Sequence, residues 1–161
     1  MLHKKRDYYW LSLLLTVVFV TGCIADSQSG DQDMEQLAAK KYIVDGHLAA
    51  CPQSPNCVNS EDLSKESFIA PLEFTGSAAG AWQILQEQIL DMGGRIEEVD
   101  DSFLHATFRS SLFRFVDDVS CRLDDENNRI YIRSASRVGY SDFGVNRKRV
   151  EQLRKQFTVS L

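Results

Sequence analysis

The stretch from Phe103 to Arg149 constrains the fold of this 161-residue chain more than any other. Apolar residues alternate there with polar ones, which is typical of half-buried β-strands. Runs of strand-like sequence are separated by short polar turns, and short connections favour neighbouring antiparallel strands. We therefore expect a four-stranded antiparallel meander made of Arg95–Asp100, Phe103–Arg109, Arg114–Leu123 and Arg129–Arg137.

Two segments beside these runs have the periodicity of amphipathic helices. Ser77 is a good N-cap for a helix over Ala78–Met92, and the glycine pair that follows would stop it. A second helix is predicted over Asn146–Phe157, with Asn146 as its N-cap. The expected fold class is α+β, with both helices packed on one face of the meander.

The first 22 residues have the pattern of an export signal. Basic residues precede the apolar run Leu11–Val20, which is shorter than the roughly 20 residues of a membrane-spanning helix. A short uncleaved anchor is the alternative. The ending Val20-Thr21-Gly22-Cys23 resembles the bacterial lipobox, which implies cleavage before Cys23 and lipidation of that cysteine. Ile24 follows, and in Gram-negative bacteria this favours passage to the outer membrane, facing the periplasm.

The rest of the chain divides into a tether and one domain. Residues 23–40 include the polar run DSQSGDQD, which is typical of a flexible linker. Residues 41–161 have the length of a single domain, which we expect to be the α+β unit. Its first part is a Cys/Pro-rich loop segment.

That loop segment contains Cys51 and Cys57 around two prolines. Disulfides persist outside the cytoplasm, so we expect a Cys51–Cys57 bridge. A metal site formed by His47, Cys51 and Cys57, with Cys121 or His105 as a fourth ligand, is the alternative. The spacing is not that of paired metal-binding cysteines, so we assign no metal, and Cys121 is most simply a buried small hydrophobe.

Several motifs resemble one protein family along most of the mature chain, from about Cys51 to Phe157. They are CPQSPNCVNS, the IAPL of Ile69–Leu72, FRSSLFRFVDDV and RSASRVGYSDFGVNRKR. Through these motifs the chain resembles domain-of-unknown-function family 1499, and it looks like a bacterial lipoprotein member of that family. The resemblance implies a small envelope or plastid protein and brings no established reaction, substrate or cofactor. Cys121 departs from the family pattern, where another residue is usual.

Acidic and basic residues are unevenly distributed. From Cys23 to Phe108 there are 4 basic and 15 acidic residues, and from Arg109 onward there are 11 and 7. On an alternating strand Asp117 points to the apolar face and Asp118 to the other, and a buried carboxylate must be paired. We expect a structural ion-pair network formed by Asp117, Asp118, Arg109 and Asp142.

The segment that leads into the second helix is the candidate for ligand binding. Arg147, Lys148 and Arg149 occupy a first turn where the helix dipole disfavours cations. Either nearby acids such as Asp142 compensate, or an anion binds there. The residues that would line such a pocket are Arg133, Arg137, Tyr140, Ser141, Asn146 and Arg147.

These features predict a lipid-anchored envelope protein that is not an enzyme and binds an anionic small molecule, a lipid head group or a protein partner. The alternative is an envelope hydrolase or transferase that uses Asp117 or Asp118 with Ser141. A purely structural subunit of an envelope complex is a third possibility. We expect no cofactor, since no phosphate loop or dinucleotide fingerprint is present. The net charge of −5 argues against nucleic acid as a partner.

Overall fold

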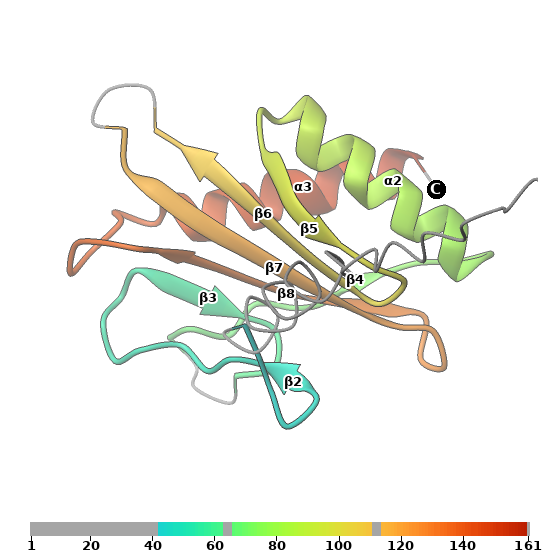
Figure 1. The fold of residues 1–161 in the computed structure, drawn as a ribbon, viewed down its shortest axis with the longest axis horizontal. Helices are drawn as coiled ribbons and strands as arrows, with labels where there is room; N and C mark the ends of the chain where they lie inside the picture. The colour runs from blue at the N-terminus through green and yellow to red at the C-terminus, as the bar shows by residue number, and fades with distance from the viewer. Residues whose placement is uncertain (1–41, 63–65, 111–113, 161) are drawn as a thin grey trace, which may run out of the picture.

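A computed structural model describes residues 42–62, 66–110 and 114–160. The predicted signal peptide, Cys23 and the tether lie outside these residues. The described chain forms a six-stranded antiparallel sheet, a small two-stranded sheet and two helices (Figure 1). Within the described ranges, neither helix is long and apolar enough to cross a membrane.

Four long strands make up the centre of the large sheet. They are β5 (Arg95–Val99), β6 (Phe103–Arg109), β7 (Val116–Asp124) and β8 (Arg129–Ser136), which pair antiparallel in chain order. The turn before β6 is held by Asp100, whose Oδ1 accepts hydrogen bonds from the backbone N–H groups of Ser102 and Phe103. The turn before β8 places Asn128 at φ +53°, a conformation that asparagine tolerates.

The sheet is larger than the predicted meander. β3 (Cys57–Asn59) and β4 (Leu72–Glu73) both pair with the outer edge of β8, so the sheet has six strands and the prediction of four was wrong. β1 (Ile43–Val44) and β2 (His47–Leu48) form the second sheet. Strands of two or three residues are too short to show an alternating pattern, and their pairing depends on the exposed edge of β8.

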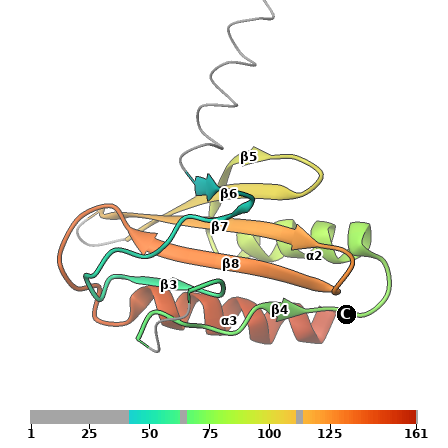
Figure 2. The ribbon, with the colours of Figure 1, turned by 90° about the horizontal axis from the view of Figure 1, so that it is seen from below.

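Both helices lie on one face of the large sheet (Figure 2). Helix α2 (Ala78–Asp91) begins at Ser77, whose hydroxyl accepts a hydrogen bond from Gly80 N at 3.1 Å. Helix α3 (Val145–Ser160) packs against α2, β3 and β8. The core between the helices and the sheet buries these side chains: Trp82, Leu85, Ile89, Leu104, Val119, Cys121, Ile130, Ile132, Val150, Leu153 and Phe157.

Gly94 allows α2 to end against the sheet. A Cβ at this position would lie 2.7 Å from the ring of Phe108 and 2.8 Å from Ile89. Real Cβ atoms do not approach other atoms so closely, so only glycine fits between the helix end and β6.

The opposite face of the sheet is covered by the β1–β2 hairpin, where β2 contacts β7 and β8. Side chains alternate along a strand, so consecutive residues of β7 face different layers. Asp117 faces the helices, and Asp118 faces the hairpin. The two carboxylates therefore belong to separate sites.

Candidate functional site

On the helix face, Asp117 is bound by an arginine of α3. Arg149 Nη2 lies 2.6 Å from Asp117 Oδ2, and both side chains are about nine-tenths buried. The guanidinium carbon also lies 4.7 Å from the centre of the Phe108 ring. This buried pair holds α3 against β6 and β7.

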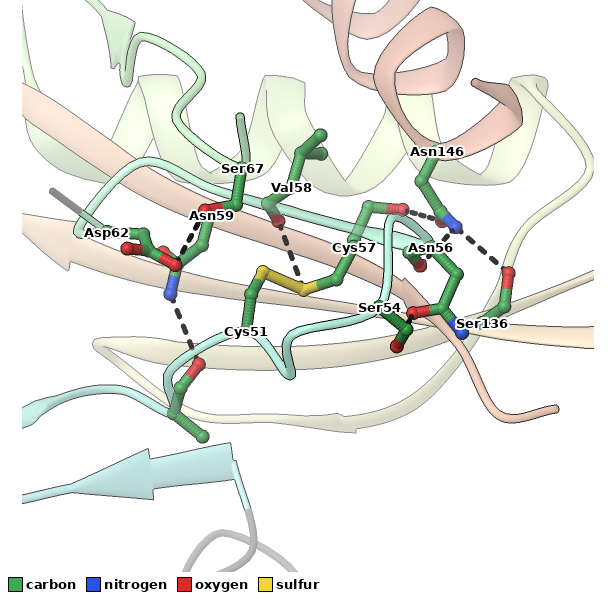
Figure 3. Close-up of a disulfide and its surroundings, with 12 residues drawn as sticks. Cys51, Ser54, Asn56, Cys57, Val58, Asn59, Asp62, Ser67, Ser136 and Asn146 are labelled. Atoms are coloured by element: carbon green, nitrogen blue, oxygen red, sulfur yellow. Dashed lines mark hydrogen bonds between the residues drawn. A yellow bond between two sulfur atoms is a disulfide. The ribbon is translucent and has the colours of Figure 1, made fainter. Parts of the chain in front are cut away.

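Asn146 connects three segments of the chain beside that pair: α3, β8 and the disulfide loop. It is fully buried, and its Oδ1 accepts hydrogen bonds from Ser134 and Arg149. Its Nδ2 donates to the backbone oxygen of Asn56 at 3.1 Å and to Ser136 Oγ at 3.0 Å (Figure 3). All of its amide groups are occupied by protein, so Asn146 has a structural role in the observed geometry.

The N-terminus of α3 is capped by Asp142 and not by Asn146. Asp142 Oδ1 accepts from Gly144 N at 2.9 Å, and Oδ2 accepts from Asn146 N at 2.7 Å. The expectation that Asn146 is the N-cap was wrong, because its side chain points into the core instead. A carboxylate at a helix N-terminus compensates the cations of the first turn. The helix start therefore needs no bound anion.

The hairpin face holds a second buried cluster around Asp118. Arg137 donates from Nε and Nη2 to this carboxylate at 2.8–3.2 Å, and His105 Nε2 lies 2.9 Å from Oδ1. Tyr42 donates to Oδ1 at 3.3 Å, and its ring stacks on His105 with centroids 4.1 Å apart. Burial tends to raise the pKa of Asp118, but hydrogen bonds from His105 and Arg137 outweigh it and hold the pKa well below its usual range.

Arg133 lies on the same face without a matching carboxylate. It forms no ion pair or hydrogen bond with a residue of the described ranges, and its Nε is buried. Burial lowers the pKa of Arg133, while Asp118 and Tyr42 act in the opposite direction. The hydroxyl of Ser120, directly across the strand pair, is also buried and has no partner in the described structure.

A cavity of about 440 Å³ lies elsewhere, between the Cys/Pro-rich loop and the start of α3. The Cys51–Cys57 disulfide closes this loop (Figure 3), and both cysteines line the cavity. Arg147 is the only member of the predicted anion-binding set that lines it, and Arg147 Nη2 donates to the backbone oxygen of Glu66 at 2.8 Å. Three carboxylates, those of Asp62, Glu66 and Asp142, are also on its walls.

The remaining lining is uncharged. It consists of Ala50, Pro52, Gln53, Ser54, Pro55, Val58, Ser67 and Gly144, in addition to the two cysteines. Asp62 Oδ2 accepts from Ser67 at 2.7 Å, and Asp142 caps the helix. Carboxylate oxygens carry several lone pairs, so Asp142 keeps the capacity to accept a further hydrogen bond while it caps the helix.

The six residues predicted to form one pocket lie in four different environments. Arg137 is paired with Asp118, Arg133 is partly buried beside it, and Asn146 is in the core. Tyr140 and Ser141 are exposed in the loop before α3, where Ser141 Oγ accepts from Phe143 N. Only Arg147 reaches the cavity.

The predicted ion-pair network is likewise divided. Asp117 pairs with Arg149, Asp118 pairs with Arg137, and Asp142 caps α3. Arg109 is exposed at the end of β6 and makes no ion pair with a described residue. Of the residues proposed for catalysis, neither aspartate nor Ser141 lines the cavity, and the aspartates face opposite sides of the sheet.

Sequence reasoning did not identify Tyr42, His105, Glu61 or Asn56 as members of polar clusters. The carboxylate of Glu61 accepts a hydrogen bond from Leu48 N and lies 2.5 Å from Arg122 Nη2. It also pairs with His47. Burial acts to raise the pKa of Glu61, but the hydrogen bonds from Arg122 and Leu48 lower it overall. No single-sequence pattern signals such pairs, since the partners are far apart in the chain.

The metal alternative finds no matching arrangement in the described ranges, where no group of three or more His, Cys, Asp or Glu side chains could hold an ion. Cys51 and Cys57 are joined to each other, and Cys121 is a buried free thiol whose pKa is raised by burial.

Comparison with protein families gives one match over this region. The family described as "Protein of unknown function (DUF1499)" matches residues 47–157, which include the disulfide loop, the whole large sheet and most of α3. No curated protein and no solved structure matches the chain.

Proposed function

The chain belongs to the family of proteins of unknown function DUF1499, and we propose that it is a lipid-anchored envelope domain that binds a small zwitterionic ligand. The cavity between the disulfide loop and α3 is the observation that carries this proposal. Its volume of about 440 Å³ falls in the usual range of ligand pockets.

The charges on the cavity walls determine the class of ligand. Among the described lining residues, Asp62, Glu66 and Asp142 are acidic and Arg147 alone is basic. A simple anion would be repelled by the carboxylates, whereas an ammonium group would be attracted. A phosphate or carboxylate on the same molecule would be bound by Arg147. The sequence suggested an anionic ligand, and the lining favours one that carries both charges.

Binding without catalysis is the simplest account of the walls. No described lining residue is a histidine, and both cysteines are oxidised, so the described lining offers neither an imidazole base nor a thiol nucleophile. The exposed Ser141 and the paired Asp117 and Asp118 lie outside it. The enzymatic alternative that uses Asp117 or Asp118 with Ser141 therefore finds no support in the described geometry.

Thermal unfolding of the anchored protein in detergent tests the ligand class. The probes are phosphoethanolamine, inorganic phosphate and ethanolamine. A ligand at 100 times its dissociation constant adds about 2.7 kcal/mol of stability, or roughly 5–10 °C in a domain of this size. We expect a clear increase in Tm with phosphoethanolamine and little with either fragment.

Two pairs of variants localise the effect. Arg147→Ala should remove the shift, while Lys148→Ala, an exposed neighbour that is not part of the lining, should keep it. Glu66→Gln should weaken the shift, while Glu126→Gln on the β7–β8 turn should not. An absence of stabilisation by phosphoethanolamine, or an equal shift in Arg147→Ala, would refute the proposed pocket.

The lipid anchor is supported by the Val20-Thr21-Gly22-Cys23 ending, and it has a separate test. Two or three acyl chains bind a membrane stably, whereas one does so only reversibly. Cys23→Ala should lose labelling by an alkyne fatty acid and leave the membrane fraction. Retained labelling would exclude Cys23 as the anchor.

A further inference from the structure

One end of the domain exposes apolar side chains from two adjacent loops. Phe143 and Tyr140 have exposed fractions of 89% and 77%, and Phe115, Val138 and Val145 are each about half exposed. We call these five residues the apolar end. Large exposed apolar groups gathered in one place mark an interaction surface more often than singly scattered ones do.

The two loops lie side by side. Arg137 N donates to Val116 O at 3.1 Å, and Ser110 N donates to Phe115 O at 2.9 Å. The end of β6, the start of β7 and the end of β8 therefore lie at the same end of the sheet, as the ribbon also shows (Figure 1). Nearby, Asn56 Nδ2 donates a hydrogen bond to Gly139 O at 2.6 Å, which fixes the loop after β8 to the disulfide segment.

The charges around the apolar end are mainly positive. Segments 109–115 and 137–148 contain five basic residues and one acidic residue, Asp142, which is engaged in capping α3. Arg109, Arg114 and Lys148 are exposed and make no ion pair with any residue that the structure describes. These cations are free to meet an external anionic surface.

The backbone directs the most exposed ring outward. Phe143 has φ +54°, a region that bulky residues rarely adopt, and no core contact explains it because the side chain is almost fully exposed. Ser141 Oγ accepts a hydrogen bond from Phe143 N, and Asp142 Oδ1 accepts one from Gly144 N, so both bonds fix this turn. Strained residues that persist on a surface are associated with binding or switching roles.

We propose that the apolar end docks on an anionic lipid bilayer, with Phe143 and Tyr140 at the level of the head groups. Aromatic side chains beside unpaired arginines and lysines suit this interface, where apolar groups enter and cations meet anionic lipids. The proposal rests on the lipid anchor of the proposed function and is independent of the cavity ligand.

The predicted tether permits this orientation. Cys23 and Tyr42 are 19 residues apart. A fully extended segment of that length spans roughly 65 Å, about twice the diameter of a small domain. The apolar end can therefore reach the bilayer in which Cys23 is anchored.

Tryptophan quenching in the full anchored chain tests the docking. Phe143→Trp places a reporter in the apolar end, and Val99→Trp places one at the exposed opposite end of β5. Each variant is incorporated in vesicles that contain anionic phosphatidylglycerol and brominated phosphatidylcholine, with the wild type as background. We expect the emission of Trp at position 143 to be quenched at least twofold more than that at position 99.

Two further arms identify the contribution of charge. The difference should decrease when phosphatidylglycerol is omitted and in Arg109→Ala combined with Arg114→Ala. Equal quenching at both positions in anionic vesicles would overturn the proposal and leave the apolar end as a surface for a protein partner. If phosphoethanolamine does not stabilise the protein but Trp at position 143 is still quenched more than Trp at position 99, the pocket is refuted and the docking proposal stands.

Discussion

Arg149 and Asp117 join helix α3 to strand β7 through a nitrogen–oxygen distance of 2.6 Å in the protein interior. Arg149 also donates from Nη1 to Asn146 and Ser134, so one side chain connects the helix start with two strands. The loop that carries Tyr140, Phe143 and part of the cavity lies directly before this helix. Its placement therefore depends on the pair.

Asp117→Asn should destabilise the protein by about 3–5 kcal/mol, because it leaves a buried guanidinium without its counter-charge. Urea unfolding measures the loss, and Glu151→Gln, which removes an exposed pair with Arg154, is the matched control. Asp117→Leu combined with Arg149→Met should recover most of the loss, since a well-packed apolar pair avoids the desolvation cost. Equal losses in the single and double variants would contradict this account.

Acid should destabilise the domain through Asp118 and Glu61. Both carboxyls have pKa values lowered below their usual range, Asp118 mainly by His105 and Arg137 against the opposing effect of burial. Their stabilisation is complete above the unfolded pKa values of about 4 and is lost as the pH falls further toward the folded values. Each such group contributes a slope of up to about 1.4 kcal/mol per pH unit in that window.

Asp118→Asn should be less stable by about 1–3 kcal/mol at pH 7, because the buried hydrogen bonds of the carboxylate with His105 and Tyr42 are weakened. Urea titrations between pH 7 and pH 2 should also show a shallower decline below pH 4 than in the wild type. Parallel declines in the two proteins would show that Asp118 does not control the acid response.

The disulfide should stabilise both the fold and the pocket. Cys51 and Cys57 are six residues apart, and closing so small a ring contributes about 2 kcal/mol in the loop-entropy account. Cys51→Ser combined with Cys57→Ser should lower the free energy of unfolding by that amount and weaken the Tm shift with phosphoethanolamine. The wild type in reductant should match the double variant, and insensitivity to reductant would contradict the expectation.

Phe143→Gly should keep or raise stability by up to about 1 kcal/mol, since glycine adopts positive φ without strain and little packing is lost. Gly144→Ala is the converse control. Its added Cβ would meet no atom within 4 Å, yet φ +79° makes any side chain costly there. Thermal melts of the two variants should therefore differ in sign, and a clear loss in Phe143→Gly would show that the ring stabilises the fold.

The sequence was sufficient for the large features of the fold. Runs of five to nine residues carry enough alternation to reveal β5 to β8, and the capped apolar stripe of α2 reveals a helix. β3 and β4 were missed because two or three residues show no period. Their formation depends on the edge of β8, which exists only in three dimensions.

The sites were predicted less well, and for a physical reason. Alternation along β7 placed Asp117 and Asp118 on opposite faces, but it could not supply their partners. The sequence places Arg109 in the predicted ion-pair network, whereas the arginine that reaches Asp117 is Arg149 of α3. Likewise His105 meets Asp118 through strand register, which a single sequence does not specify.

Cys121 has a consequence for how the protein matures. It is wholly buried in the core, its thiol has a raised pKa, and thiolates are the species that exchange with disulfides. Once β7 enters the sheet, this thiol is buried and reacts poorly with a disulfide. Mispairing of Cys121 with Cys51 or Cys57 is therefore confined to the interval before β7 enters the sheet.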